Sequence, residues 1–227
     1  EAQLASRLPI VPKTLQTIAR RVGKRPDELK PLLDRMADKG LVFDFPHPRK
    51  GDFYMLAPPV VGFFEFSMMR IRTDIDQKAL AHLLCTYMYD QRAFVDELAK
   101  GKTPIGRTLA NEQSIESVTT EVLAFDRASE VIKRAKTHSV SLCYCRHKKE
   151  HTGHACKAPT DVCLSLGTAA DYVIRHGHGR EIDTEEALEV LHTCRQLGLV
   201  QIADNVQNEP AYLCNCCGCC CGQLSAI

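Results

Sequence analysis

Near its end the chain reads Cys214-Asn215-Cys216-Cys217-Gly218-Cys219-Cys220-Cys221, so six of eight consecutive residues are cysteine. A hydrophobic core does not need this density, because a free cysteine serves there as one small apolar residue among others. Disulfides do not explain it either, since neighbouring cysteines largely fail the separation and side-chain direction that a bridge requires. Thiolates at this density are typical of a soft metal centre, either zinc or an iron–sulfur cluster.

A second group of cysteines precedes this tail. Four thiolates in one segment are the complete ligand set of a [4Fe–4S] cluster or of a tetrahedral zinc ion. The two segments therefore predict one or two metal centres per chain, and they could share ligands. All ten cysteines are candidate ligands: Cys143, Cys145, Cys156 and Cys163 upstream, and Cys214, Cys216, Cys217, Cys219, Cys220 and Cys221 in the tail.

We expect the four upstream cysteines to form one compact group. In the tail, alternate cysteines are the natural second group, because immediate neighbours point apart when the backbone is extended. The alternation of Val140, Leu142 and Tyr144 with smaller residues predicts a strand whose end carries Cys143 and Cys145 on one face.

A basic stretch follows this cysteine pair. It has two compatible interpretations, a solvated loop or a source of positive charge and hydrogen bonds for anionic thiolates. His147 and His151 are also spaced as half of a zinc site, which we rank below the cysteines because four thiolates already suffice. His178 is a weaker ligand candidate. The stretch comprises Arg146, His147, Lys148, Lys149, His151 and His154.

The two remaining cysteines lie on the apolar faces of predicted helices, so we expect both to be core thiols. Cys85 falls in a helix predicted over 77–99, whose buried stripe would be Leu80, Leu83, Leu84 and Met88. Cys194 falls in a helix that begins with a capping box at Asp183 and Glu186.

The first 60 residues have the order of a winged helix-turn-helix. Apolar residues at helical spacing predict one helix over 15–22 and another over 26–39, with Gly23 and Gly40 ending them. Two short strands follow, over 41–45 and 53–56, with a Pro- and Gly-containing turn between them.

The second of these helices would be the recognition helix of a DNA-binding winged helix. Between residues 27 and 39 it carries four acidic and three basic side chains, whereas binding to phosphates requires a cationic face. We therefore expect no sequence-specific DNA binding, although arginines and lysines over 20–25 and 49–50 could form a modest basic patch.

Composition and length complete this interpretation. With 227 residues, 44% of them hydrophobic and 25% charged, the chain has the composition of a soluble globular protein large enough for more than one domain. Lys plus Arg (29) balance Asp plus Glu (28), which gives no electrostatic bias toward nucleic acid or membrane. No apolar run approaches the roughly 18 residues of a membrane span.

Thiolate-rich sites favour a reducing compartment, so we expect a cytoplasmic protein. Because the chain begins at Glu1 rather than Met, we expect residues to precede it.

We predict an α+β protein with a winged helix over 1–60, a helical connecting region over 61–125 and a cysteine-rich iron–sulfur domain over 126–227. This order of segments resembles a family of 4Fe–4S ferredoxin-type proteins from anaerobic bacteria and archaea. The motifs that carry the resemblance are Cys143-x-Cys145-Arg146, Cys156-x6-Cys163, Arg180-Glu181-Ile182, Gly198-Leu199-Val200 and the cysteine tail. The resemblance implies an iron–sulfur protein that transfers electrons to a redox partner. Many members carry a two-cluster ferredoxin module after the tail. This chain has no C-x2-C-x2-C-x3-C run and stops at Ile227, which puts electron relay in question.

The expected function is therefore [4Fe–4S] chemistry in electron transfer or in redox support of a partner protein. One alternative is a redox-responsive transcription regulator, and another is a zinc-stabilised interaction protein. The sequence shows no phosphate-binding loop, nucleophile elbow or paired catalytic carboxylates, so we do not expect an enzyme.

Overall fold

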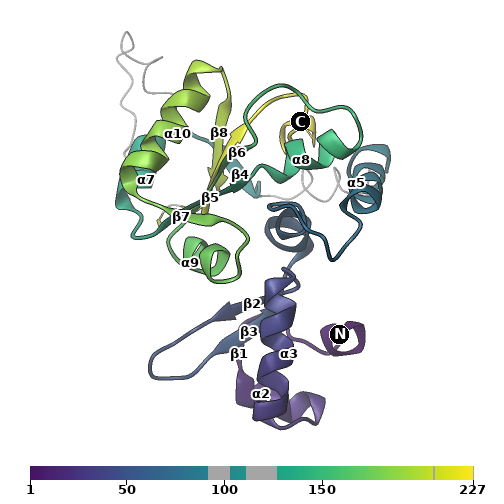
Figure 1. Ribbon diagram of the computed structural model, residues 1–227. Helices are drawn as coiled ribbons and strands as arrows, with labels where there is room; N and C mark the ends of the chain where they lie inside the picture. Colours follow the sequence, from purple (N-terminus) through teal and green to yellow (C-terminus); the bar gives the residue numbers. More distant parts are fainter. Residues whose placement is uncertain (92–102, 111–126, 207, 227) are drawn as a thin grey trace.

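The computed structural model describes residues 1–91, 103–110, 127–206 and 208–226. Its lower part in Figure 1 is an N-terminal unit formed by residues 1–57, and its upper part is a larger unit built around a six-stranded sheet. The combination of helices and antiparallel sheets agrees with the predicted α+β class.

The N-terminal unit contains α1 (Ala2–Ala5), α2 (Leu15–Val22) and α3 (Pro26–Asp38), close to the predicted bounds. Its sheet, in the order β1-β3-β2, consists of β1 (Lys13–Thr14), β2 (Val42–Phe45) and β3 (Phe53–Leu56). Helix α2 begins where the side chain of Thr14 accepts a hydrogen bond from the backbone N–H of Thr17, and it ends at Gly23 with a φ of 70°. The apolar stripes of α2 and α3 form the core of this unit, as their spacing predicted.

The connecting region continues with η1 (Pro59–Phe63), α4 (Phe64–Phe66), α5 (Gln77–Cys85) and η2 (Thr86–Asp90). The helix predicted over 77–99 is therefore present to residue 90, and residues 92–99 lie outside the described part. One prediction for its buried stripe is wrong, because Leu83 is 69% exposed. The other predicted members hold, since Leu84 and Met88 are buried and Leu80 is partly buried. Ala81 joins Leu84 on this face, which packs against Met68 and Tyr144.

The second sheet has the strand order β4-β8-β9-β6-β5-β7, and its neighbouring strands are all antiparallel. Helices α7 and α10 pack on one face of this sheet, and α9 covers the other, toward the N-terminal unit (Figure 1). The strands are β4 (Gly106–Thr108), β5 (His138–Leu142), β6 (Asp161–Leu166), β7 (Arg180–Ile182), β8 (Val200–Asp204) and β9 (Tyr212–Cys216). The helices are α7 (Ala128–Arg134), α8 (Tyr144–His151), α9 (Thr168–Arg175), α10 (Thr184–Gln196) and the final 3-10 turn η5 (Leu224–Ala226).

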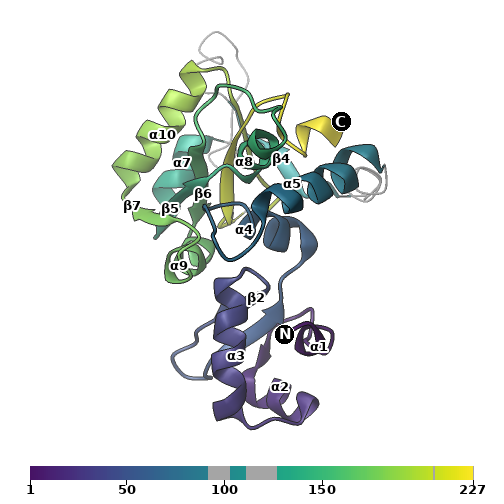
Figure 2. The same cartoon turned by 45° about the vertical axis from the view of Figure 1, so that its right-hand side comes forward.

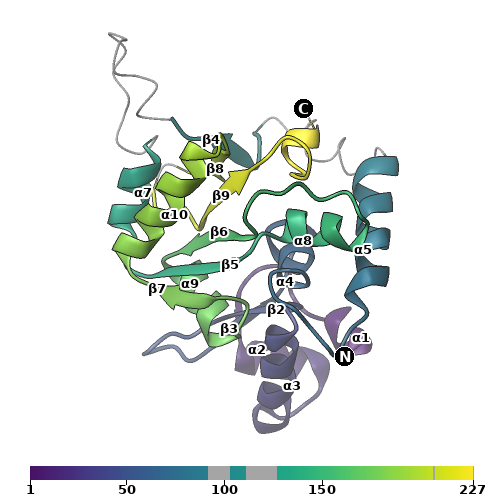
Figure 3. The ribbon, with the colours of Figure 1, turned by 45° about the horizontal axis from the view of Figure 1, so that its top comes forward.

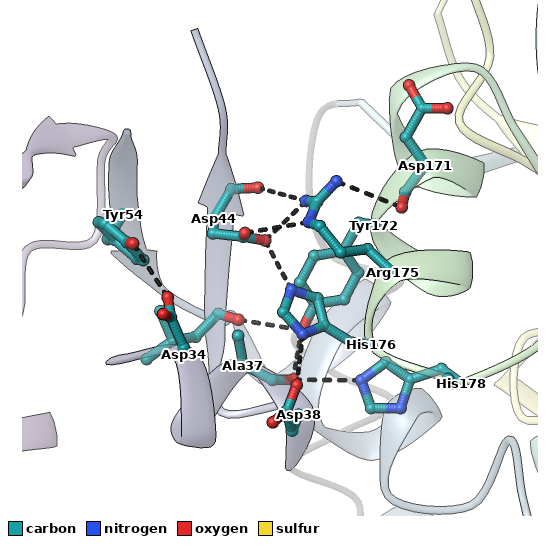
Figure 4. Close-up of polar contacts among 12 residues, drawn as sticks. Asp34, Ala37, Asp38, Asp44, Tyr54, Asp171, Tyr172, Arg175, His176 and His178 are labelled. Atoms are coloured by element: carbon teal, nitrogen blue, oxygen red, sulfur yellow. Dashed lines mark hydrogen bonds and ion pairs between the residues drawn. The ribbon is translucent and has the colours of Figure 1, made fainter. Parts of the chain in front are cut away.

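The C-terminal end of α9 joins the two units through a network of polar contacts (Figure 4). Arg175 donates to the carboxylate of Asp44 on β2 at 2.8 Å. The two ring nitrogens of His176 lie 2.7 Å from Asp38 and 2.9 Å from Asp44. The buried hydroxyl of Tyr172 lies within 3.0 Å of two backbone carbonyls of the N-terminal unit, those of Ala37 and Val42. The cysteine-bearing sheet is thus held against the N-terminal unit by buried, directional contacts.

Candidate metal centre

All twelve cysteines lie among the described residues, and all are free thiols. The ten candidate ligands come from four segments of the upper unit: the start of α8, the loop after α8, strand β6, and β9 with the tail that follows it. Figure 3 shows the tail turning back beside α8 after β9, and Figure 2 shows the same proximity from another side. The ten thiols form two groups, and the division between them does not follow the sequence.

Seven thiols line a cavity of about 100 Å³ in the upper unit. This volume is several times the roughly 10–15 Å³ that one water molecule needs. Apolar side chains such as Phe66, Met69 and Val173 complete the wall. Six of these seven thiols form the inner thiol group, which consists of Cys143, Cys145, Cys163, Cys214, Cys216 and Cys221. The seventh, Cys217, also belongs to the surface group described below.

Strand pairing explains how the inner thiol group is assembled. Cys214 and Cys216 are two residues apart on β9 and therefore share one face of the strand, as predicted. The pairing of Leu164 with Leu213 between β6 and β9 places Cys163 next to Cys214. Cys221 then returns from the tail, and its Sγ lies 3.3 Å from that of Cys216.

The predicted strand placement of the Cys143-x-Cys145 pair is wrong. Strand β5 ends at Leu142, Cys143 is the N-cap residue of α8, and Cys145 lies in the first turn of that helix. The pair still reaches one cavity, because a helix that starts directly after the strand turns both side chains inward. The neighbouring thiols of Cys143 and Cys221, which can donate to the sulfur of Cys145, hold its pKa well below the usual value.

The other four thiols form a surface group, which consists of Cys156, Cys217, Cys219 and Cys220. Their sulfur atoms all lie within 4.8 Å of one another, and this group could hold a metal ion. Cys156 Sγ is 3.6 Å from Cys217 Sγ, and Cys219 Sγ is 3.7 Å from Cys220 Sγ. Cys219 is exposed, whereas Cys220 is buried. Cys156 therefore belongs with the tail, not with the upstream cysteines with which we expected it to group.

The basic stretch after Cys145 is helical as far as His151, with His154 in the loop that follows, and two of its cations are fully buried. The guanidinium of Arg146 donates to the carbonyls of Pro159 (2.8 Å) and Asn215 (2.7 Å) and lies beside the thiols of Cys156 and Cys217. Burial alone would lower the pKa of Arg146, but the surrounding thiolates raise it. Arg146 thus places a permanent positive charge between the two thiol groups.

Lys148 is the second buried cation. Its Nζ lies 2.8 Å from Met88 Sδ and 3.2 Å from the hydroxyl of Tyr89, and it sits above the rings of Tyr89 and Tyr144. Burial lowers its pKa, while the negative charge of Cys145 acts in the opposite direction. Within the described part of the chain, no carboxylate lies within ion-pair distance of this ammonium group.

Sequence reasoning missed one ionisable group of the cavity wall, Glu65 on α4. Burial raises its pKa to about 7, although its carboxylate accepts a hydrogen bond from the backbone N–H of Gly62 at 2.9 Å. The bond secures a turn in which Val61 adopts a φ of 55°, an unusual conformation for a β-branched residue. The local sequence offers no signal for this role, because Glu65 lies within an otherwise apolar stretch.

The histidine candidates do not complete a site of their own. His147 and His151 have their Nε2 atoms 3.2 Å apart, and Nδ1 of His147 lies 2.7 Å from the carbonyl of Met68. No third ligand atom joins them among the described residues. His178 lies at the junction of the two units, where its Nε2 faces the carbonyl of Ala37 at 3.2 Å. Burial lowers the pKa of His178 to about 3, so it is neutral there.

The two cysteines predicted to be core thiols lie outside both groups. Cys194 on α10 is fully buried beside Val162 and Leu199. Burial raises the pKa of Cys194 to about 11. Cys85 at the end of α5 is only half-buried, less than predicted.

No protein-family model, no curated protein and no solved structure matches this chain. None of the helices described is both long and apolar enough to cross a membrane. The assignment of a function therefore depends on the geometry of the two thiol groups.

Proposed function

We propose that the protein binds an iron–sulfur cluster in the inner thiol group and serves in electron transfer or in redox support of a partner protein. The observation that supports this proposal is the convergence of six thiols on one buried cavity. The residues fit such a group in kind and number, since a [4Fe–4S] cluster takes four thiolates and six are present. The proposal agrees with what the resemblance of the cysteine tail implies.

The surrounding residues support the same proposal. A bound cluster would supply reversible one-electron chemistry. Cys163, Cys214 and Cys216 lie on paired strands, so they would hold their sulfur atoms in fixed positions. The cavity wall is mostly apolar, and Lys148 offers a buried positive charge with no carboxylate partner in the described part of the chain. Burying a cation of this kind destabilises the fold unless an anion lies near it. The thiolates of a bound cluster would provide this negative charge.

For the N-terminal unit we propose a winged helix with a structural or protein-binding role. Its would-be recognition helix, α3, has its Lys30 engaged by Asp34 at 3.2 Å and by Asp52 at 3.1 Å. The C-terminal end of α3 is occupied by contacts with His176 and Tyr172. A helix neutralised and covered in this way offers little to DNA phosphates. Retention of one particular DNA sequence over random competitor at physiological salt would refute this part of the proposal.

The metal content of the anaerobically isolated chain tests the proposal. We expect iron and acid-labile sulfide, together with visible absorbance. Cys145→Ser should lower the iron content and bleach the absorbance, because Cys145 is a buried member of the inner thiol group. Cys194→Ala is the matched control, a buried cysteine outside both groups, and should retain both signals. A colourless chain that contains only zinc would contradict the proposal.

A further inference from the structure

The spacing of the sulfur atoms separates the two thiol groups into different kinds of site. Four ligands placed tetrahedrally at the usual Zn–S distance of about 2.3 Å lie about 3.8 Å from one another. Two pairs of the surface group have this spacing, Cys156–Cys217 at 3.6 Å and Cys219–Cys220 at 3.7 Å, and all four sulfur atoms lie within 4.8 Å of one another. In a [4Fe–4S] cluster each thiolate binds a different iron atom, so the four sulfur atoms lie farther apart than they do around a single ion.

The inner thiol group differs in this respect, although it contains one close pair, Cys216 and Cys221, whose sulfur atoms are 3.3 Å apart. No three of its sulfur atoms converge as the surface four do, because its members are distributed around a cavity of about 100 Å³. Among the described residues, the surface group is the one set of three or more potential ligands whose ligand atoms are mutually close enough for one ion.

We propose that Cys156, Cys217, Cys219 and Cys220 bind a single Zn²⁺ ion with a structural role, separate from the redox centre. The donor set is the four-cysteine set of closed structural zinc sites, which leave no position open for substrate. This inference goes beyond the proposed function and does not depend on it. Cys217 lines the cavity as well, but the inner thiol group keeps six cysteines that the surface group does not use.

The charges around the surface group fit a tetrathiolate zinc site. Four thiolates and one Zn²⁺ carry a net charge of −2, and the buried guanidinium of Arg146 lies beside Cys156 and Cys217. The carbonyls that orient this guanidinium, those of Pro159 and Asn215, belong to the two segments that also supply the ligands.

The position of the site explains what the ion would do. Cys156 lies in the loop between α8 and β6, a segment with little regular structure, and is 61 residues from Cys217. An ion shared by these residues would fasten the loop to the tail. It would also fix the backbone at Cys217 and Cys220. Their chain neighbours, Cys216 and Cys221, are members of the inner thiol group. The zinc site would thereby support one wall of the cavity.

Elemental analysis of the full chain tests the proposal. We expect about one zinc per chain in the wild type. The double variant Cys156→Ala/Cys219→Ala should lose this zinc while still binding iron, because the inner thiol group is intact. Cys163→Ser should show the reverse, retained zinc and reduced iron, and Cys85→Ala should change neither metal. Zinc retained in the double variant, or a wild type with no zinc in which the double variant loses iron, would overturn the proposal.

A second measurement keeps the test decisive if the double variant is unstable. The metal-free wild-type chain is titrated anaerobically with Co²⁺, whose visible absorption reports tetrahedral thiolate coordination. One equivalent should produce this spectrum in the wild type and in Cys163→Ser but not in Cys219→Ser, whose substituted side chain is exposed. An unaltered spectrum in Cys219→Ser would also overturn the proposal. Failure of the iron–sulfur proposal would be seen separately, as a wild type that contains zinc and no iron.

Discussion

Asp44→Asn should weaken the junction between the N-terminal unit and the cysteine-bearing unit. Asp44 on β2 is nearly buried, and its carboxylate accepts hydrogen bonds from Arg175 at 2.8 Å and from His176 at 2.9 Å (Figure 4). Burial acts to raise the pKa of Asp44, but these two partners outweigh burial and lower the pKa from 3.8 to about 2. At about 1.4 kcal/mol per pKa unit, the ionised carboxylate contributes about 2 kcal/mol to the free energy of unfolding at neutral pH.

The stabilisation from Asp44 depends on pH, because folding changes the pKa of its carboxyl. Because the pKa of Asp44 is lower in the folded state, its contribution is complete above about pH 5 and is lost as the pH falls toward 2. Burial acts to lower the pKa of His176, but its bonds with Asp44 and Asp38 raise it. The stabilisation from protonated His176 is therefore present at low pH and is lost as the pH rises through the folded-state pKa.

Urea unfolding of the wild type and Asp44→Asn, at pH 7 and at pH 3, measures this contribution. We expect the variant to be less stable by about 2 kcal/mol at pH 7, and by clearly less at pH 3, where the Asp44 carboxyl of the unfolded chain is already mostly protonated. Asp161→Asn is a suitable control, because its carboxylate is half-exposed and lies 3.8 Å from an exposed arginine. The control should change stability by no more than about 1 kcal/mol. The reasoning would be refuted if Asp44→Asn left the free energy of unfolding unchanged at pH 7, or lowered it equally at both pH values.

Three further predictions concern single side chains. Tyr172→Phe removes a buried hydroxyl that lies within 3.0 Å of two carbonyls, so urea unfolding should show a free energy of unfolding lower by about 1–2 kcal/mol. An unchanged unfolding midpoint would mean that this hydroxyl does not hold the units together. Lys148→Met removes the buried cation beside the cavity, so a redox titration of the iron-loaded protein should give a more negative potential. The partly exposed Lys149→Met is its control, and equal shifts in the two variants would contradict a specific role for Lys148. Cys85→Ala should leave the metal content unchanged and lower the free energy of unfolding by about 1 kcal/mol. Loss of metal in this variant would show that Cys85 is a ligand.

Much of the secondary structure could be predicted from local sequence signals. The bounds of α2, α3, β2 and β3 follow from helical spacing, glycines and a short turn, and each depends on residues a few positions apart. The same holds for α10, where the side chain of Asp183 accepts a hydrogen bond from the backbone N–H of Glu186 as its capping box predicts. Apolar spacing does not decide which neighbour a helix meets. Leu83 was therefore assigned to the buried face of α5, although that helix packs through Leu80, Ala81 and Leu84 and leaves Leu83 exposed.

The sequence by itself determined that this chain concentrates thiols, because six cysteines in eight residues have no other ordinary use. Only the tertiary structure decided how those thiols are divided. Alternation placed Cys214 and Cys216 together while the backbone was extended. It ceased to apply where the tail turns after β9, so the immediate neighbours Cys219 and Cys220 belong to the same group. Cys156 joined the tail because the loop after α8 returns to it across 61 residues, a contact that no local pattern encodes. The burial of Arg146 and Lys148 likewise depends on how α8 packs between the thiol groups and α5, since charge in a sequence does not reveal the depth at which it will lie.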